Sequence, residues 1–159
     1  MTESHRRAAD HRSTSLPQET VDALQRALAT EHAAVWVYGL VSAFLPNTVS
    51  GPLEDGMRTH TTRRDEATRM LKDAGAEPRP AEAAYLTPQP VTDRASALTA
   101  LTVAETDAAA AWRSVLEHTI DATARRAGLD WLTDCAVRST RWRLFAGQRP
   151  AAAALPGGV

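Results

Sequence analysis

The sequence has little of several residue types, and each shortage excludes a class of protein. The single cysteine, Cys135, excludes an internal disulfide and a thiolate zinc site. Aromatic residues make up only 5% of the 159 residues, and runs of strand-forming residues are nearly absent. No apolar run is long enough to span a bilayer, and the N-terminal stretch MTESHRRAADHRSTS lacks the apolar centre of a signal peptide. We therefore expect no membrane partner and a cytoplasmic location.

The charge balance and the abundance of alanine narrow the fold class. The formal net charge is -1 and the mean hydropathy is -0.32, which gives no sign of a nucleic-acid partner. Of the 18 basic residues only Lys72 is a lysine, and codon bias explains this as well as a function would. Because alanine has the highest helix propensity of all residues, the composition favours an all-α protein.

Apolar residues spaced three and four apart predict four helices. Ser15 is expected to cap the first helix and Pro46 to end it, while Gly75 is expected to close the second and Asp121 to cap the fourth. The predicted helices cover residues 15–45, 50–75, 93–120 and 121–147.

A proline-rich stretch separates the two helix pairs. Four prolines lie between residues 76 and 93, so this segment is expected to be an extended linker. Its roughly 18 residues, at about 3.3 Å each, can span ~60 Å, the length of a bundle. Short links make each helix pair antiparallel, so the predicted fold is a ferritin-like four-helix bundle with one long crossover. The predicted domains are a disordered tail at 1–14, the bundle at 15–147 and a flexible C-terminal tail at 148–159.

Three stretches carry a family resemblance. ALQRALATEHAAVWVYGLVSAFLP, TRRDEATRMLKDAGAEP, and AETDAAAAWRSVLE followed by LTDCAVRSTRWR resemble an actinobacterial ferritin-like domain of unknown function. The resemblance covers about residues 18–147. It implies the bundle architecture and no particular activity.

The ferritin-like pattern allows a test for a di-iron site. Such sites take one Glu from each of two helices and a Glu-x-x-His motif from each of the other two. Glu31 and Glu105 fall on the buried stripes of the first and third helices, as the lone glutamates should. The two Glu-x-x-His motifs are absent, because Arg69 follows Glu66 and Val137 follows Asp134 at the histidine positions. The sequence therefore predicts that no functional di-iron site is present and that no cofactor is bound.

Arginine is the predicted partner of each buried glutamate. If the first link turns near residue 49, Glu31 lies close to Arg63 and Arg64. Tyr38 then lies level with His60, and the two are expected to form a hydrogen bond. If the second link turns near residue 123, Glu105 lies level with residue 141 and one turn from Arg138. Arginine can bind a carboxylate through a bidentate pair of hydrogen bonds. The predicted buried polar core comprises Glu31, Glu105, Arg63, Arg64, Arg138, Arg141, Tyr38 and His60.

Three functions stay open at this point. The first is an uncharacterised structural or interaction protein, a homodimer formed through the second apolar stripe of the first helix, which contains Trp36. The second is an oxidoreductase or storage protein with a reduced iron or manganese site made by Glu31, His60, Glu105 and Asp134. The third is a small-molecule binder with a pocket near Trp112, Tyr38 and His60, for which the sequence names no ligand.

Overall fold

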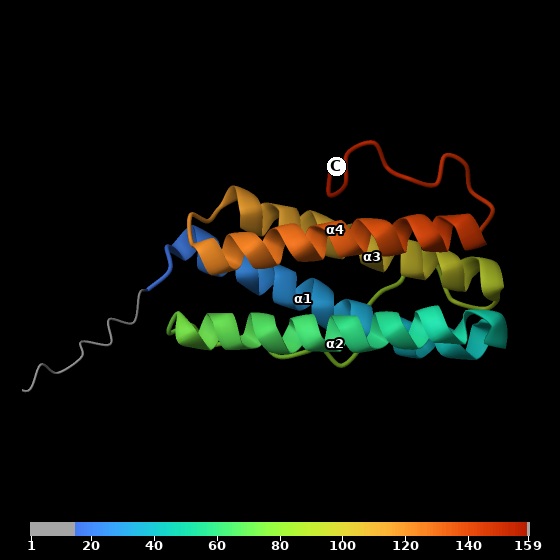
Figure 1. Cartoon of the computed structure of the whole chain (residues 1–159). Helices are drawn as coiled ribbons and strands as arrows, with labels where there is room; N and C mark the ends of the chain where they lie inside the picture. Colours follow the sequence, from blue (N-terminus) through green and yellow to red (C-terminus); the bar gives the residue numbers. More distant parts are fainter. Residues whose placement is uncertain (1–14, 159) are drawn as a thin grey trace, which may run out of the picture.

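The computed structural model describes residues 15–158, and in that part of the chain all regular structure is helical. The helices are α1 (Gln18–Val41), α2 (Ser50–Asp73), α3 (Arg94–Glu117) and α4 (Ala122–Phe145), each of 24 residues. They run along one another in two antiparallel pairs (Figure 1). The predicted all-α four-helix bundle is thus confirmed. The tail at 1–14 lies outside the described residues.

The helix ends follow local capping rules with one exception. Asp93 caps α3 through a capping box with Ser96, and Asp121 caps α4 by accepting the backbone N–H of Ala124. Gly75 ends α2 with a φ of 76°, a conformation that glycine adopts without strain. The predicted Ser15 cap is wrong, because Pro17 occupies the N-cap position of α1 and no side chain caps that helix.

Both links between paired helices differ from their predicted positions. Two 3-10 helices, η1 (Ser42–Phe44) and η2 (Asn47–Val49), fill the first link, so α1 ends at Val41 instead of Leu45. This link is therefore centred between residues 45 and 46. The second link lies between Glu117 and Ala122 and is centred between residues 119 and 120. Each centre lies about one helical turn before its predicted position, which changes the residues that face one another.

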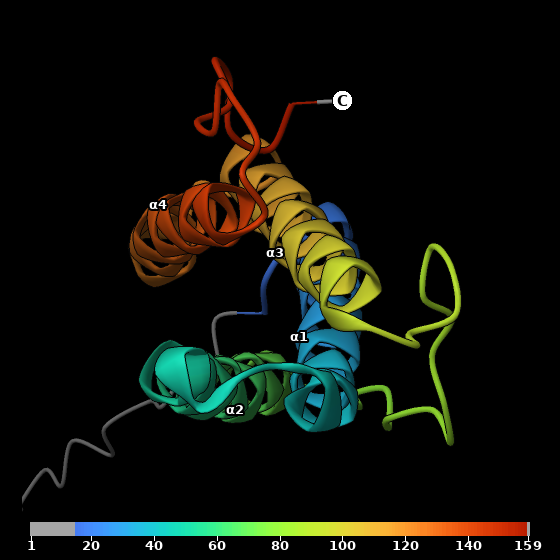
Figure 2. The ribbon, with the colours of Figure 1, turned by 90° about the vertical axis from the view of Figure 1, so that its right-hand side faces the viewer.

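The four helices do not contact one another equally. Helix α1 packs against both α2 and α3, and α3 packs against α4, whereas α2 and α4 approach each other only loosely. The end view in Figure 2 shows this open side, with the crossover on the opposite side of the bundle, next to α1 and α3. None of the described helices has the length and apolar character that crossing a membrane requires.

The crossover is anchored to α1. The side-chain amide of Gln25 donates to the carbonyl of Glu77 at 2.7 Å and accepts the N–H of Arg79 at 3.0 Å. Further along, the ring of Tyr85 lies 6.0 Å from that of Trp36, so the crossover partly covers the stripe expected to form a dimer contact. The homodimer stays a prediction.

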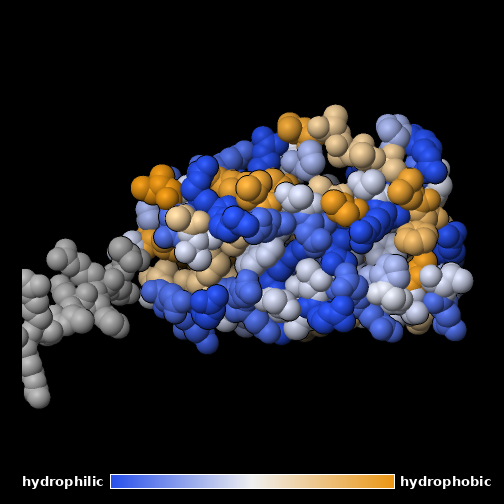
Figure 3. All heavy atoms as spheres, in the orientation of Figure 1, coloured by the Kyte–Doolittle hydropathy of each residue, from blue (hydrophilic) through white to orange (hydrophobic). Residues whose placement is uncertain are grey.

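Two apolar clusters fill the bundle on either side of a polar centre. One cluster includes Val37, Leu98 and Trp142, and the other includes Leu24, Leu71 and Trp112. The outer face in Figure 3 is largely hydrophilic, with apolar residues over α4 and the C-terminal segment. The exposed large apolar side chains of α4 and the C-terminal segment are those of Leu129, Val137, Leu144, Phe145 and Leu155.

Gly56 on α2 is required because Tyr38 of α1 lies directly against it. A Cβ at position 56 would come within 2.7 Å of the Tyr38 hydroxyl oxygen and closer still to its ring. The absence of a side chain therefore lets Tyr38 extend into the centre of the bundle. Gly51 on the same helix has no such neighbour within 4 Å.

We expect Gly56→Ala to lower the free energy of unfolding by about 2 kcal/mol, since overpacking a core outweighs the gain of alanine in helix propensity. Gly51→Ala is the matched control and should be neutral or slightly stabilising. Urea unfolding followed by circular dichroism measures both. A Gly56→Ala variant as stable as Gly51→Ala would contradict the close contact with Tyr38.

Candidate functional site

The centre of the bundle contains two carboxylates with one imidazole between them. His60 of α2 places Nδ1 2.6 Å from Oε2 of Glu31 on α1 and Nε2 3.1 Å from Oε1 of Glu105 on α3. All three side chains are fully buried, at 0% exposure. Three of the four helices therefore meet through these hydrogen bonds. We call Glu31, His60 and Glu105 the buried triad.

Three aromatic donors complete the surroundings of the buried triad. Trp112 donates its indole N–H to Oε1 of Glu31 at 2.6 Å. Tyr38 donates its hydroxyl to Oε1 of Glu105 in a short hydrogen bond. Trp142 in turn donates to the Tyr38 hydroxyl oxygen at 2.9 Å. These bonds compensate for the removal of the carboxylates from water, which is otherwise costly.

His60 is held in its protonated form. Each ring nitrogen faces a carboxylate oxygen, and only the imidazolium can donate from both nitrogens. Burial of the ring by itself lowers the pKa of His60, but the hydrogen bonds and charges of Glu105 and Glu31 outweigh this and raise the pKa from 6.5 to about 9. Burial, with the nearby Glu105 carboxylate, raises the pKa of Tyr38 well above its usual range, so the phenol keeps its proton.

A second polar layer connects α2 to α4 on the open side of the bundle. Arg63 donates Nη1 to the Cys135 sulfur at 2.9 Å and Nη2 to the Asp134 carboxylate. Arg138 donates to Asp134 at 2.9 Å and to Asp55 at 2.7 Å. Side chains rather than close helix packing therefore hold α2 and α4 together.

The thiol of Cys135 is part of this layer but is not activated. Burial, and then the charge of Glu105, raise the pKa of Cys135 well above its usual value, against the lowering effect of Arg63. The thiolate is the nucleophilic form of cysteine, so this thiol is unreactive at neutral pH. The side chain of Cys135 is also fully buried, at 0% exposure.

The structure brings together most of the predicted polar core but pairs it differently. Glu31 is bound by His60 and Trp112, not by Arg63 or Arg64. Arg64 is half-buried and pairs with Asp65. Tyr38 bonds to Glu105 instead of His60, whose ring it contacts at a centroid distance of 5.2 Å.

On α4 the predicted pairing is also wrong. Glu105 was expected to meet Arg138 and Arg141, but Arg138 is bound to Asp55 and Asp134, and Arg141 is exposed. The cause is the position of the second link, which places Glu105 level with Asp134 and Cys135 instead of residue 141.

Sequence reasoning missed the two indole donors. Trp112 and Trp142 both lie on the predicted buried stripes, but neither indole N–H was predicted to belong to the polar core. A buried tryptophan usually finds an acceptor for its N–H, and this rule could have linked them to the buried polar groups. Asp55 and Gly56 carried no recognisable signal.

The residues present do not fit a dinuclear metal site. Both nitrogens of His60 are engaged by carboxylates, and Asp134 is engaged by two arginines. Only one carboxylate oxygen of the buried triad, Oε2 of Glu105, has no hydrogen-bond partner. Among residues 15–158, no group of three or more His, Cys, Asp or Glu side chains is arranged to hold a metal ion.

Raising the pH should destabilise the fold through His60. Because the pKa of His60 is higher in the folded chain, about 9 against 6.5, its stabilising effect is fully present below pH 6.5 and is lost as the pH rises through 9. We expect the free energy of unfolding to fall by on the order of 3 kcal/mol over this interval.

Urea titrations at several pH values measure this loss. A His118→Gln control, at an exposed position, should keep the decline, whereas His60→Gln should remove it. A flat profile for the unmodified protein between pH 6.5 and 9.5 would show that His60 is not held as the imidazolium.

Glu105→Ala should destabilise the protein by about 3–5 kcal/mol, because it leaves the imidazolium with one carboxylate and removes the acceptor of Tyr38. Glu117→Ala, on the exposed end of the same helix, should change stability by less than about 0.5 kcal/mol. Chemical unfolding compares the two. A small effect at Glu105 would contradict its role in the buried triad.

Comparisons with known proteins agree with this architecture. The chain is similar to a conserved hypothetical protein, rv2844, from Mycobacterium tuberculosis, whose crystal structure matches with a TM-score of 0.80 and 38% sequence identity. The match covers 87% of this chain and 98% of that one. No curated protein matches the chain significantly. A family model described as Domain of unknown function (DUF4439) matches residues 23–159, and the chain therefore belongs to this family.

Proposed function

We propose that the protein is a ferritin-like bundle in which an imidazolium takes the place of the dinuclear metal centre, and that it acts as a structural or interaction protein. The observation that carries this proposal is the position of His60, with one ring nitrogen on Glu31 and the other on Glu105. The long crossover between the two helix pairs and the lone glutamates on α1 and α3 support the ferritin-like assignment.

Charge balance supports a centre without metal. Ferritin-like di-iron sites use four carboxylates to offset the charge of the metal ions. Here Glu31 and Glu105 supply two negative charges and His60 between them supplies one positive charge, while the charge of Arg63 is paired with Asp134. A divalent cation at the same place would be repelled by the imidazolium.

Burial argues against chemistry on a substrate at this centre. Every atom of the buried triad is shielded from solvent, and five of its six polar side-chain atoms are hydrogen-bonded. Buried polar groups can specify how helices pair, since other pairings leave them without partners. We assign this role to the buried triad, which selects one alignment of α1, α2 and α3.

The second candidate is a metal-binding protein with iron or manganese at a reduced site. The observation in its favour is Oε2 of Glu105, a buried carboxylate oxygen without a partner. Binding there would require His60 to lose a proton and to release at least one carboxylate. The pKa of about 9 opposes the loss of that proton at neutral pH.

Metal content distinguishes the two candidates. The protein is produced in medium supplemented with iron and manganese, purified without chelators and analysed by mass spectrometry of its metals. We expect less than stoichiometric metal, together with a melting temperature that neither EDTA nor added Fe²⁺ or Mn²⁺ changes. A metal that binds the native state would stabilise it, by about 2.7 kcal/mol at 100 times its Kd.

One metal ion per chain, lost in Glu31→Gln and in Glu105→Gln but retained in Glu117→Gln, would overturn the proposal. This result would assign the protein to the metal-binding candidate.

A further inference from the structure

A cavity of about 700 Å³ lies between α3, α4 and the C-terminal segment after α4. No residue of the buried triad or of the Arg63–Asp134 layer lines it. Its volume is within the range of about 300–1,000 Å³ that is typical of small-molecule sites. This cavity is therefore separate from the centre on which the proposed function rests.

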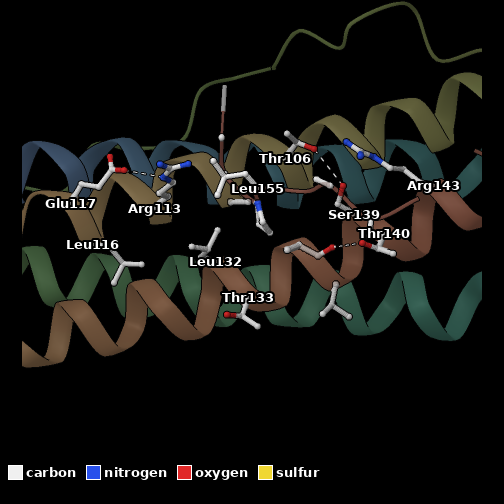
Figure 4. Close-up of a pocket in the computed structure, with 18 residues that line it drawn as sticks. Thr106, Arg113, Leu116, Glu117, Leu132, Thr133, Ser139, Thr140, Arg143 and Leu155 are labelled. Carbon is white, nitrogen blue, oxygen red and sulfur yellow. Dashed lines mark hydrogen bonds and ion pairs between the residues drawn. The ribbon is translucent and has the colours of Figure 1, made fainter. Parts of the chain in front are cut away.

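The walls of the cavity are mainly apolar along most of its length. Figure 4 shows Leu116 and Leu132 on one side and Leu155 facing them from the C-terminal segment. The small side chains of Ala109 on α3 and Ala136 on α4 widen the space between the two helices. An aliphatic ligand bound here would be removed from water, and this burial of apolar surface would favour binding.

Donors gather at one end of the cavity. The Arg143 side chain extends toward Thr106 and Ser139, as Figure 4 shows. Ser139 is only 8% exposed, and the contact of its hydroxyl is with Thr106 at 3.4 Å. Because Thr106 already donates to the carbonyl of Thr102 at 2.8 Å, Ser139 is the donor in its contact with Thr106. A ligand at this end would therefore replace only this long, 3.4 Å hydrogen bond of Ser139.

The charge at this end is not balanced by any side chain of residues 15–158. No carboxylate within residues 15–158 forms an ion pair with Arg143. At the opposite end, Arg113 is paired with Glu117 at 2.9 Å. The cavity thus has one cationic end, one neutral end and an apolar middle, which is the charge pattern complementary to an amphipathic anion.

The C-terminal segment is seated closely enough to form the outer wall. Gly157 has a φ of 69°, and a Cβ there would lie 2.9 Å from the Ala109 carbonyl oxygen on α3. Ala151, at the start of the segment, is 9% exposed. The segment is therefore in contact with the bundle on both sides of Leu155, the residue that faces the cavity.

We propose that this cavity binds an aliphatic monocarboxylate of medium chain length. The carboxylate would accept hydrogen bonds from Arg143 and Ser139, and the hydrocarbon chain would lie between Leu132 and Leu155. Arginine is suited to a carboxylate because its donors match the two oxygens. The proposal goes beyond the metal-free centre and does not depend on it.

Calorimetric titration of the full chain with octanoate, decanoate and dodecanoate tests the proposal. We expect one site per chain and an affinity that rises about fourfold for each added methylene, since each buried methylene contributes about 0.8 kcal/mol. Decan-1-ol and decylammonium should bind at least about tenfold more weakly than decanoate, because neither forms the charge-assisted bonds to Arg143.

Two matched variants locate the site. Arg143→Gln should weaken decanoate binding about tenfold or more, while Arg141→Gln, at an exposed position of the same helix that does not line the cavity, should leave it unchanged. Ala136→Trp should abolish binding by filling the space. Melting temperatures confirm that each variant is folded.

Equal binding of decanoate and decan-1-ol, equal effects of the two arginine variants, or several ligands per chain would each overturn the proposal. None of these outcomes changes the result expected for the metal content of the protein. The proposal of a carboxylate-binding cavity and the proposal of a metal-free centre can therefore be refuted independently.

Discussion

Two carboxylates buried in the middle of the bundle must each be given a partner, and the imidazolium of His60 is a partner to both. Glu31 and Glu105 come from different helix pairs, so their shared bond to His60 ties the two halves of the chain together. The other polar contacts of the interior are arranged around this requirement. Trp112 and Tyr38 each satisfy one of the carboxylates, and Gly56 has no side chain because Tyr38 needs its space.

The helices on the open side, α2 and α4, are held together by a different kind of contact. Helices α2 and α4 are too far apart for their small side chains to interlock, and long side chains bridge the gap. Arg63 extends from the inner layer to Asp134, and Arg138 returns from α4 to Asp55. An arginine side chain has the length and the several donors needed for such a bridge. The use of arginine in place of lysine, with Lys72 as the single lysine, thus serves the packing of α2 against α4.

The helices and the burial of both glutamates could be predicted, but their partners could not. Helix periodicity identifies a residue's face, and it placed Glu31, His60 and Glu105 correctly on inward stripes. Partners also depend on the height of each residue along the bundle, which is set by the length and conformation of the links. The two 3-10 turns at Ser42–Phe44 and Asn47–Val49 have no strong sequence signal, and with them the facing pairs of α1 and α2 differ by about two turns from the predicted ones. The earlier position of the second link does the same for α3 and α4. As a result His60 was predicted to lie two turns from the carboxylates that it actually binds.

The crossover has a consequence for the order in which the chain assembles. During synthesis the N-terminal helix pair emerges first, carrying Glu31 and His60, while Glu105 and Trp112 follow the proline-rich segment. Until α3 packs against α1, the imidazole of His60 has only the Glu31 carboxylate as a partner. The face of α1 that packs against α3 is then exposed to water. The first hairpin alone therefore leaves His60 and one face of α1 without some of their partners, and the contacts that complete the centre join residues far apart in sequence. A larger share of such contacts is associated with slower folding than in bundles built from local pairs. The protein's centre is complete only when both halves are present.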